Sequence, residues 1–395
     1  MVNYIEDYIG KMAEGKEEKP VVLQVLPELE HGGVEWGTIQ VAEALKQRGY
    51  TNFVASKGGR LVHELDKLGV EHFTLSLKTK NPIKMYLNSL KLEKIIKQNG
   101  INIVHARSRA PAWSAYWAAK RAGVKYMTTF HGTYGLGPRG IKKFYNRVMT
   151  YGRLIIAISN HIKKHMIDNY QVDPAKIRLI PRCVDVDKFS PRAVTQERIV
   201  RAISDNNLPE DLPIIALVGR ITRWKGQHLL VEAMSLIKHK EAYAIIVGSD
   251  QGRVNYTEEL KKNAKKLGVD SRIQFIGESF DIPALLMVSD IVLSTAIEPE
   301  AFGRAAIEGQ AMGKIVLASN IGGSLENLID GVSGKLFQSN DAKSLAEAID
   351  WALDLPLAER KAISAAAIKN VHDNFTKQIM CNKTIDVYNE LLKID

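Results

Sequence analysis

Cysteine is scarce in this chain, and long apolar runs are absent. The 395 residues include two cysteines, Cys183 and Cys381, which are too few and too far apart for a disulfide framework or a cysteine metal site. No apolar run approaches the roughly 18 residues of a membrane-spanning helix. Residues 1–20 hold five acidic residues and no apolar core of the signal-peptide type. These absences predict a protein of a reducing cytoplasm.

Acidic residues are also scarce across one long stretch. Residues 72–167 contain 18 Lys and Arg residues and a single acid, Glu93. Residues 1–200 carry a net charge of +14 and residues 201–395 one of −4, which gives the total of +10. Such an imbalance predicts an anionic partner: nucleic acid, an acidic lipid surface or a phosphorylated glycolipid. Nucleic acid is the weakest of the three, because no helix-turn-helix, zinc spacing or RNP-like strand is found.

Two segments of this stretch interleave cations with apolar and aromatic residues, as a helix at a membrane surface does. The first spans residues 78–91, and the second spans 138–149 with Lys142, Lys143 and Arg147 among its cations. Packing of the apolar residues into the core accounts for either segment equally well. The membrane interpretation predicts a protein that is peripheral on the inner face of the cytoplasmic membrane.

Both halves of the chain alternate apolar, strand-like runs with helical patterns, which predicts parallel sheets covered by helices on both faces. A strand, a glycine turn and a helix at 21–45 are echoed at 214–237. The sequence therefore predicts an α/β fold with two Rossmann-like, doubly wound domains. The predicted boundaries are an N-terminal extension at 1–20, a first domain at 21–195, a polar linker at 191–213, a second domain at 205–365 and C-terminal helices at 366–395.

Two carboxylates stand in segment 298–313, which follows a strand-like run and opens a helical pattern. Glu300 lies in the turn and Glu308 about two helical turns further on, so the pair is on the order of 12 Å apart. A glycosidase pair would need roughly 5–9.5 Å. The wider spacing suits a ligand with hydroxyls at both ends and phosphates in the middle, because the amides of Phe302 and Gly303 form an anion site at the helix N-terminus. A nucleotide diphosphate-sugar has this shape.

A basic loop upstream supplies cations for such a ligand. Residues 214–219 read as a buried strand, and the loop after it holds Arg220 and Lys225. Two cations at the C-terminal end of a strand can neutralise a diphosphate as its bond to a sugar breaks. Neither segment by itself is a specific signal of a nucleotide-sugar site, but the two segments in this order are.

Six motifs run along the chain in a fixed order. They are Gly32-Gly33 with Glu35, Thr129-Phe130-His131-Gly132, Ile158-Ser159 with Lys163, residues 180–191, Arg220 with Lys225-Gly226, and Glu300 with Glu308. In these motifs the chain resembles family 4 of the glycosyltransferases, retaining enzymes of the GT-B fold, from about residue 21 to beyond residue 350. Arg182-Cys183 stands where the family has Asn-Gly, and Gly309-Gln310 where it has Ala-Met. These flanking departures bear on substrate detail more than on reaction type.

The resemblance implies an N-terminal acceptor domain and a C-terminal sugar-nucleotide domain that face across a cleft, with a C-terminal helix that crosses back. It implies that Glu308 accepts hydrogen bonds from the ribose and Glu300 from the donor sugar, while Arg220 and Lys225 hold the diphosphate. The implied catalytic residues are Glu300, His131, Arg220 and Lys225, and the implied donor-binding residues are Gly33, Arg220, Lys225, Phe302, Gly303 and Glu308.

Position supports some of these assignments and opposes other candidates. His131 follows a strand, at the edge where open α/β sheets bind ligands, whereas His105 and His161 lack that support and are expected to be structural. Asp185 and Asp187 resemble a metal motif but fit a hydrogen-bonded turn better. The pair Gly322-Gly323 either brings amides near the ligand or simply makes a turn.

The predicted function is a retaining glycosyltransferase that uses a nucleotide diphosphate-sugar, with a UDP-sugar favoured, and needs no metal or cofactor. In this family the departing phosphate, rather than an enzymic base, is favoured to take the acceptor's proton. The basic first half points to a membrane-associated glycan or lipid acceptor, such as lipopolysaccharide core or a capsule precursor. Two alternatives remain: a sugar-nucleotide epimerase of the same architecture, and a non-catalytic protein that binds anionic membranes.

Overall fold

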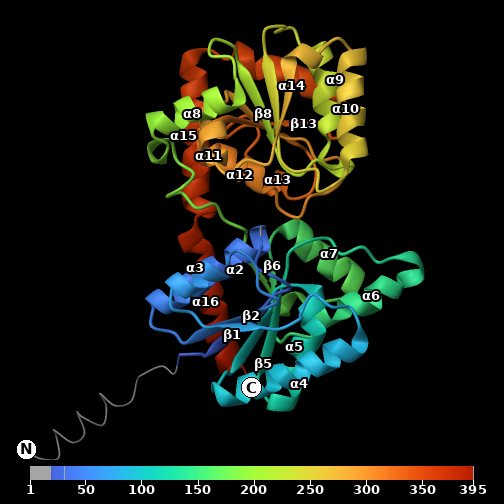
Figure 1. Ribbon diagram of the computed structural model, residues 1–395, viewed down its shortest axis with the longest axis vertical. Coiled ribbons are helices and arrows are strands. Elements are labelled where there is room, and N and C mark those ends of the chain that lie inside the picture. Colours follow the sequence, from blue (N-terminus) through green and yellow to red (C-terminus); the bar gives the residue numbers. More distant parts are fainter. Residues whose placement is uncertain (1–18, 31, 395) are drawn as a thin grey trace, which may run out of the picture. The chain divides into compact units, whose positions relative to one another are not determined.

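The computed structural model describes residues 19–30 and 32–394, which fold into two compact units (Figure 1). The first unit comprises the described residues up to Phe130, Gly135–Ile156 and the residues from Cys381 on. The second comprises His131–Tyr134 and Ala157–Met380. The expected N-terminal extension, 1–20, lies almost wholly outside the described residues.

The first sheet has seven strands in the order β3-β2-β1-β4-β5-β6-β7. The interior strand β1 (Val22–Val25) pairs in parallel with β2 and β4. All four residues of β1 are buried, as expected for a strand covered on both faces. The other strands are β2 (Asn52–Ser56), β3 (His72–Thr74), β4 (Ile103–Ala106), β5 (Lys125–Phe130), β6 (Ile155–Ala157) and β7 (Ile177–Leu179).

The helices of the first unit begin and end at residues with clear local signals. Asn81 caps α4 by accepting hydrogen bonds from the amides of Ile83 and Lys84, and Pro82 occupies the first helical turn. Gly123 ends α5 in the left-handed conformation. The helices are α2 (Gly33–Gln47), α3 (Val62–Lys67), α4 (Pro82–Gln98), α5 (Arg109–Ala122), α6 (Ile141–Asn146) and the greater part of α16 (Lys377–Lys393), with 3-10 turns at Pro138–Gly140 and Arg147–Thr150.

The C-terminal helix α16 is anchored to the first unit by a buried polar chain. Tyr388 is completely buried, and its hydroxyl lies 2.7 Å from Nδ1 of His105. Nε2 of His105 lies 2.7 Å from Oγ1 of Thr129. Burial lowers the pKa of His105 well below its usual range, and the Arg107 guanidinium lowers it further, so the imidazole is neutral. His105 therefore has the structural role expected from the sequence.

The second sheet has six strands in the order β10-β9-β8-β11-β12-β13. Every neighbouring pair is parallel. The direction of winding reverses between β8 and β11, as it does between β1 and β4 in the first sheet, so the prediction of two doubly wound parallel sheets is confirmed. The strands are β8 (Ile214–Val218), β9 (Tyr243–Val247), β10 (Ile273–Gly277), β11 (Ile291–Ser294), β12 (Ile315–Ser319) and β13 (Lys335–Phe337).

The second unit holds most of the remaining helices, seen in Figure 1 on both faces of its sheet. None of the helices in the described parts of the chain is both long and apolar enough to span a bilayer. The helices are α7 (Asn160–Tyr170), α8 (Gln196–Asn206), α9 (Gln227–Leu236), α10 (Val254–Lys266), α11 (Ile282–Met287), α12 (Arg304–Ala311), α13 (Ser324–Asn327), α14 (Ala342–Asp354) and α15 (Leu357–Asn374).

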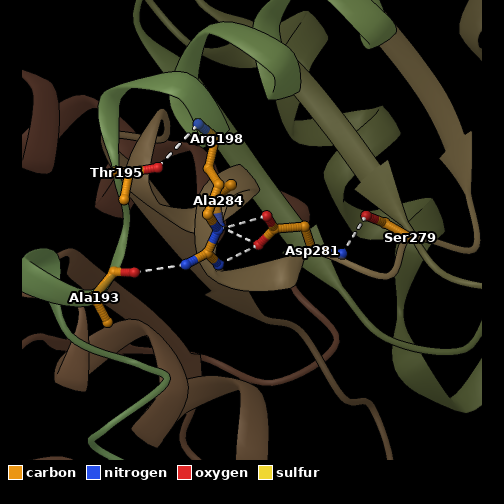
Figure 2. Close-up of polar contacts among 6 residues, drawn as sticks. All are labelled: Ala193, Thr195, Arg198, Ser279, Asp281 and Ala284. Carbon is orange, nitrogen blue, oxygen red and sulfur yellow. Dashed lines mark hydrogen bonds and ion pairs between the residues drawn. The ribbon is translucent and has the colours of Figure 1, made fainter.

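The predicted linker at 191–213 is wrong, because this segment contains helix α8 and packs into the second unit. Figure 2 shows the contact that holds it: the Arg198 guanidinium donates to both carboxylate oxygens of Asp281, at 2.8 and 2.6 Å. Asp281 also accepts from the amide of Ala284 and so caps α11. Arg198 thereby lowers the pKa of Asp281. The polar residues that suggested a linker form the exposed face of an amphipathic helix, whose other face joins the core through Ala202.

The unit boundaries differ from the predicted domain boundaries. The second unit runs without a break from Ala157 to Met380, yet β7 within this range belongs to the first sheet, so a first domain that ends near residue 195 stays a prediction. Helix α15 packs on α12 and β12, although residues 366–374 were expected on the first unit. As expected, α16 returns the chain to the first unit at Cys381.

The buried chain through Tyr388 generates a prediction about stability. Replacing Tyr388→Phe leaves one ring nitrogen of the buried His105 without its partner, which should lower the free energy of unfolding by about 1–3 kcal/mol in urea denaturation. The control is Tyr50→Phe, which removes a 3.2 Å hydrogen bond to Asn389 on the same helix at a partly exposed position. Water can replace that partner, so the loss there should stay below about 1 kcal/mol. Equal losses in the two variants would contradict this role for His105.

Candidate functional site

Two loops meet at the C-terminal ends of β8 and β11, the neighbouring strands between which the winding of the second sheet reverses. This is the position at which open α/β sheets bind ligands. The amide of Ile297 donates to the carbonyl of Trp224 at 2.9 Å, and Oγ1 of Thr295 donates to the carbonyl of Lys225 at 2.8 Å. Gly226 has a φ of 72°, and a Cβ there would lie 2.0 Å from the carbonyl oxygen of Thr295. Only glycine lets the loops approach this closely.

Lys225 and Glu300 form an ion pair between these two loops. Their side chains are 16% and 14% exposed. Nζ of Lys225 donates to Oε1 of Glu300, while Oε2 of Glu300 is buried and has no hydrogen-bond partner in the described part of the chain. The sequence assigned Lys225 to phosphates and Glu300 to a sugar, and the structure brings the two side chains into contact. The free oxygen of Glu300 remains an acceptor for a ligand hydroxyl.

Helix α12 begins at Arg304, four residues after Glu300. Its N-terminal amides therefore follow the turn that holds Glu300. Gly303 precedes the helix in the left-handed conformation, with a φ of 89°. The Phe302 ring is buried against Phe375, with centroids 5.7 Å apart. Asn327 donates from Nδ2 to the carbonyls of Phe302 and Gly303. The contacts with Phe375 and Asn327 therefore hold the turn in place. The N-terminus of α12 attracts an anion.

The pair Gly322-Gly323 packs against this turn. The amide of Gly323 donates to the carbonyl of Glu300 at 2.7 Å. A Cβ on Gly323 would lie 2.5 Å from Cα of Phe302, and one on Gly322 would lie 2.7 Å from the amide nitrogen of Glu300. These glycines therefore permit backbone contact that holds the Glu300 segment in place.

Glu308 lies on α12 and is buried, with 7% of its surface exposed. Arg304, one turn earlier, donates from Nη2 to Oε1 of Glu308 at 2.5 Å. The Glu308 carboxylate raises the pKa of Arg304. The sequence analysis missed Arg304, although its spacing of four residues from Glu308 is the signal for a helical ion pair.

Arg220 follows β8 and has an exposed side chain. Its carbonyl accepts a 2.9 Å hydrogen bond from Nε2 of Gln227, which holds the backbone of the loop. No carboxylate among the described residues pairs with its guanidinium. Arg220 thus adds an available cation beside Lys225.

A second set of contacts ties helix α7 to the same turn. Oγ of Ser159 donates to the carbonyl of Ala301 at 2.6 Å. The Glu326 carboxylate accepts from the amides of Asn160 and His161 at 2.6 and 2.7 Å, and so caps α7. Burial lowers the pKa of His161. Sequence reasoning placed Ser159 in a motif but did not identify Glu326, because no local pattern links residues 165 positions apart.

His131 and Gly33 stand at the ends of other elements. His131 follows β5 directly and groups with the second unit. Gly33 is the first residue of α2 in the first unit, as predicted. Their assigned ligand contacts stay predictions.

Acidic residues at 185–187 form a turn, as expected. Oδ1 of Asp185 accepts from the amide of Asp187 at 3.2 Å, and the carbonyl of Asp185 accepts from Phe189 at 2.8 Å. Within the described residues, no cluster of three or more His, Cys, Asp and Glu side chains is arranged to hold a metal ion.

Two family models match the chain. The model described as Glycosyltransferase Family 4 covers residues 31–188, and the model described as Glycosyl transferases group 1 covers residues 200–370. Among curated proteins, the D-inositol 3-phosphate glycosyltransferase of Salinispora tropica is 29% identical over 235 residues. That match covers 57% of this chain and 48% of the relative, so the chain spans about half the length of that protein.

Solved structures match over nearly the whole chain. A glycosyltransferase from Rickettsia africae ESF-5 is 42% identical with a TM-score of 0.89, and the match covers 96% of this chain and 100% of that one. HepE from Anabaena, solved in complex with UDP-glucose, is 22% identical with a TM-score of 0.79 and a coverage of 94% and 99%. The second likeness shows the fold alone.

Proposed function

The chain belongs to family 4 of the glycosyltransferases, with the GT-B fold, and we propose that it transfers a sugar from a nucleotide diphosphate-sugar to an anionic acceptor at a membrane, with retention of configuration. The observation that carries this proposal is the Lys225–Glu300 pair, which sets a cation and a carboxylate with one free oxygen at the switch point of the second sheet. A nucleotide-sugar presents phosphates and hydroxyls side by side at its scissile bond.

Each charged group has a role in this proposal. As the bond from the sugar to the diphosphate breaks, negative charge grows on the leaving phosphate, and Arg220, Lys225 and the N-terminus of α12 stabilise it. Oε2 of Glu300 accepts from a donor-sugar hydroxyl, and Glu308 accepts from the ribose. His131 contacts the donor sugar and Gly33 approaches the phosphates. We favour a UDP-sugar, because the same fold holds UDP-glucose in HepE.

The competing activities fit less well. An epimerase of similar architecture would release no nucleotide diphosphate, and neither matching family model describes one. A non-catalytic membrane-binding protein would not need the half-buried Lys225–Glu300 pair. Release of free UDP only when acceptor is present would separate transfer from both alternatives.

We propose an anionic acceptor because of the basic first half of the chain, with lipopolysaccharide core or a capsule precursor as candidates. The Salinispora relative is named for a phosphorylated acceptor, inositol 3-phosphate. An anionic acceptor of this general kind would be attracted by the 18 cations of residues 72–167.

Membrane contact is proposed from a surface of the first unit that we call the α4–α6 face. Its exposed residues on α4 are Ile83, Tyr86, Leu87 and Leu90, and on α6 Phe144, which is 68% exposed. Met85 turns inward and is buried, so only one side of α4 faces the core. Helix α5 packs on α4, and its Trp113 lies 6.1 Å from the Phe144 ring. Exposed apolar residues among lysines are typical of a helix at a bilayer surface.

The donor site generates the first functional prediction. Glu308→Gln, Lys225→Ala and Glu300→Gln should each lower the rate of transfer at least about tenfold, because hydrogen bonds to ionised groups contribute roughly 1.5–3 kcal/mol. Lys225→Ala also leaves the half-buried Glu300 carboxylate without its partner, which destabilises the loop. Glu300→Gln keeps a hydrogen-bond acceptor for Lys225 and separates loss of chemistry from loss of folding.

Matched controls for these variants are Glu258→Gln and Lys261→Ala, an exposed pair on α10. Both should keep wild-type rates in a UDP-release assay, and all variants except Lys225→Ala should keep the wild-type melting temperature. Wild-type turnover in Glu308→Gln and Glu300→Gln together would refute the proposed site.

Metal independence is a second prediction. Arg220, Lys225 and the N-terminus of α12 already place positive charge at the diphosphate. A divalent ion would stabilise the charge of the leaving diphosphate in the same way. Transfer should therefore keep more than about half of its rate in excess EDTA, measured as UDP release. Complete loss in EDTA, with recovery on addition of Mg²⁺ or Mn²⁺, would overturn it.

The α4–α6 face generates a third prediction. Each cation near an acidic surface contributes about 1 kcal/mol, and the attraction decays over roughly 8–10 Å in physiological salt. Replacing Lys142, Lys143 and Arg147 by Ser should reduce co-sedimentation with phosphatidylglycerol vesicles by at least about tenfold at low salt. UDP affinity should not change, because its proposed site lies in the second unit.

The control replaces three exposed lysines of α10, Lys261, Lys262 and Lys265, by Ser, which removes the same charge from the second unit. That variant should sediment like the wild type. Membrane docking is disproved if the wild type ignores acidic vesicles at low salt or pellets equally with phosphatidylcholine vesicles.

A further inference from the structure

A pocket of about 370 Å³ lies in the second unit beside the candidate donor site. We call it the Trp224 pocket. Its volume falls within the range of about 300–1,000 Å³ that is usual for small-molecule sites. None of the roles assigned above uses it. Its lining residues are Thr222, Arg223, Trp224, Arg253, Tyr256 and Glu298.

The pocket shares a wall with the proposed donor site. Trp224 and Lys225 are neighbours in the loop after β8, and Nζ of Lys225 lies 4.6 Å from the centroid of the Trp224 ring. Glu298 stands next to Ile297, whose amide binds the carbonyl of Trp224. A ligand in contact with Trp224 would therefore be close to Lys225.

One buried hydroxyl at the pocket lacks a partner among the described residues. Thr222 is 7% exposed, and its Oγ1 forms no hydrogen bond with any described residue. Buried polar groups are nearly always satisfied, and an exception indicates a ligand or a bound water. Thr222 lines the pocket, which makes a polar ligand or a water there the candidate partner for this hydroxyl.

The charges at the pocket favour an anion that also carries hydroxyls. Arg223 is neutralised by Glu259 and stacks over Tyr256 at 4.8 Å. Among the described residues, Arg253 donates to two neutral oxygens, the carbonyl of Asp250 and Oε1 of Gln251. It immediately precedes α10, a helix of 13 residues whose N-terminus has no side-chain cap, so the helix dipole adds positive potential there.

Glu298 and Trp224 restrict the kind of anion. The structure shows no ion pair of Glu298 with another described residue, so its carboxylate can accept hydrogen bonds from hydroxyl groups. The indole of Trp224 offers an apolar surface on which a ring can lie. A cation, a carboxylate, a hydroxyl and an aromatic surface together suit a sugar ring with an acidic substituent.

We propose that the Trp224 pocket binds an acidic sugar unit of the acceptor, a sugar ring that carries a carboxylate or a phosphate group. This rests on the proposed function, because the pocket adjoins the donor site. The ring lies on Trp224, its acidic group meets Arg253 and the N-terminus of α10, and its hydroxyls bind Glu298 and Oγ1 of Thr222. The pocket then selects acceptors by charge before the transferred sugar arrives.

Direct binding tests this proposal. Glucuronic acid, glucose 6-phosphate and neutral glucose are titrated into the full-length protein at millimolar concentrations, with saturation-transfer NMR as the readout. We expect glucuronic acid or glucose 6-phosphate to bind at least about tenfold more tightly than glucose, because charge-assisted hydrogen bonds are stronger than neutral ones. The stronger of the two acids shows whether the pocket prefers a carboxylate or a phosphate.

Two variants locate the binding. Arg253→Gln should weaken binding of the acidic sugar about tenfold. Thr222→Val keeps the side-chain shape and removes the unpartnered hydroxyl, so it should weaken binding without lowering the melting temperature. The matched control is Arg201→Gln, an exposed arginine of α8 paired with Glu197, which should bind like the wild type.

UDP separates this proposal from the proposed function. UDP should raise the melting temperature of the wild type and of Arg253→Gln equally, and it should not displace the acidic sugar. Absence of any UDP effect would count against the donor site alone. Equal binding of glucose and the acids, unchanged binding in Arg253→Gln, or displacement by UDP would each overturn the acidic-sugar pocket, and displacement would assign it to the nucleotide instead.

Discussion

The ion pair between Lys225 and Glu300 is the interaction on which the organisation of the second unit's candidate site depends. Burying two charges carries a desolvation cost that close contact only partly offsets, so the pair needs support from its surroundings. The two loops supply it through the bond from Ile297 to Trp224 and the bond from Thr295 to Lys225. With one carboxylate oxygen held by Lys225, the other is fixed in position as an acceptor.

Close backbone packing makes this arrangement rigid. Gly226 lets the first loop lie on the carbonyl of Thr295, and Gly323 lets a third segment lie on Phe302. Asn327 then binds the carbonyls just before α12. The amides at the start of α12 are therefore presented by a turn that is fixed on several sides. Preorganised donors of this kind stabilise developing charge without reorganising during a reaction.

The loop after β8 contributes to two binding surfaces at once. Lys225 faces Glu300, while its neighbour Trp224 lines the adjacent pocket. The two side chains also contact each other, because Nζ of Lys225 lies 4.6 Å from the centroid of the Trp224 ring. We infer that donor and acceptor recognition are adjacent in this unit because one strand end carries both. The first unit contributes a separate surface, the α4–α6 face, in which one helix buries Met85 and exposes Tyr86.

The sequence by itself determined the strands, the glycine turns and the order of the motifs, because these depend on local patterns. Apolar runs such as Ile214–Val218, and the glycines after them, can be recognised as strands and turns without knowledge of their tertiary contacts. The sequence also placed Arg220, Lys225 and Glu300 in loops that follow strands, and Glu308 on the helix that comes after Glu300. Segment 191–213 shows where local pattern failed, since the exposed face of α8 reads like a polar linker until Arg198 meets Asp281.

Only the tertiary structure decided which of these residues touch. Lys225 and Glu300 are 75 positions apart, and Glu326 caps a helix that begins 166 positions before it. No spacing rule connects such residues, because their proximity results from the parallel pairing of β8 with β11 and from the packing of helices around that sheet. The pocket beside Trp224 likewise gathers residues from three segments. The chemical character of each position depends on its own residue type, whereas the contacts among positions follow from long-range packing.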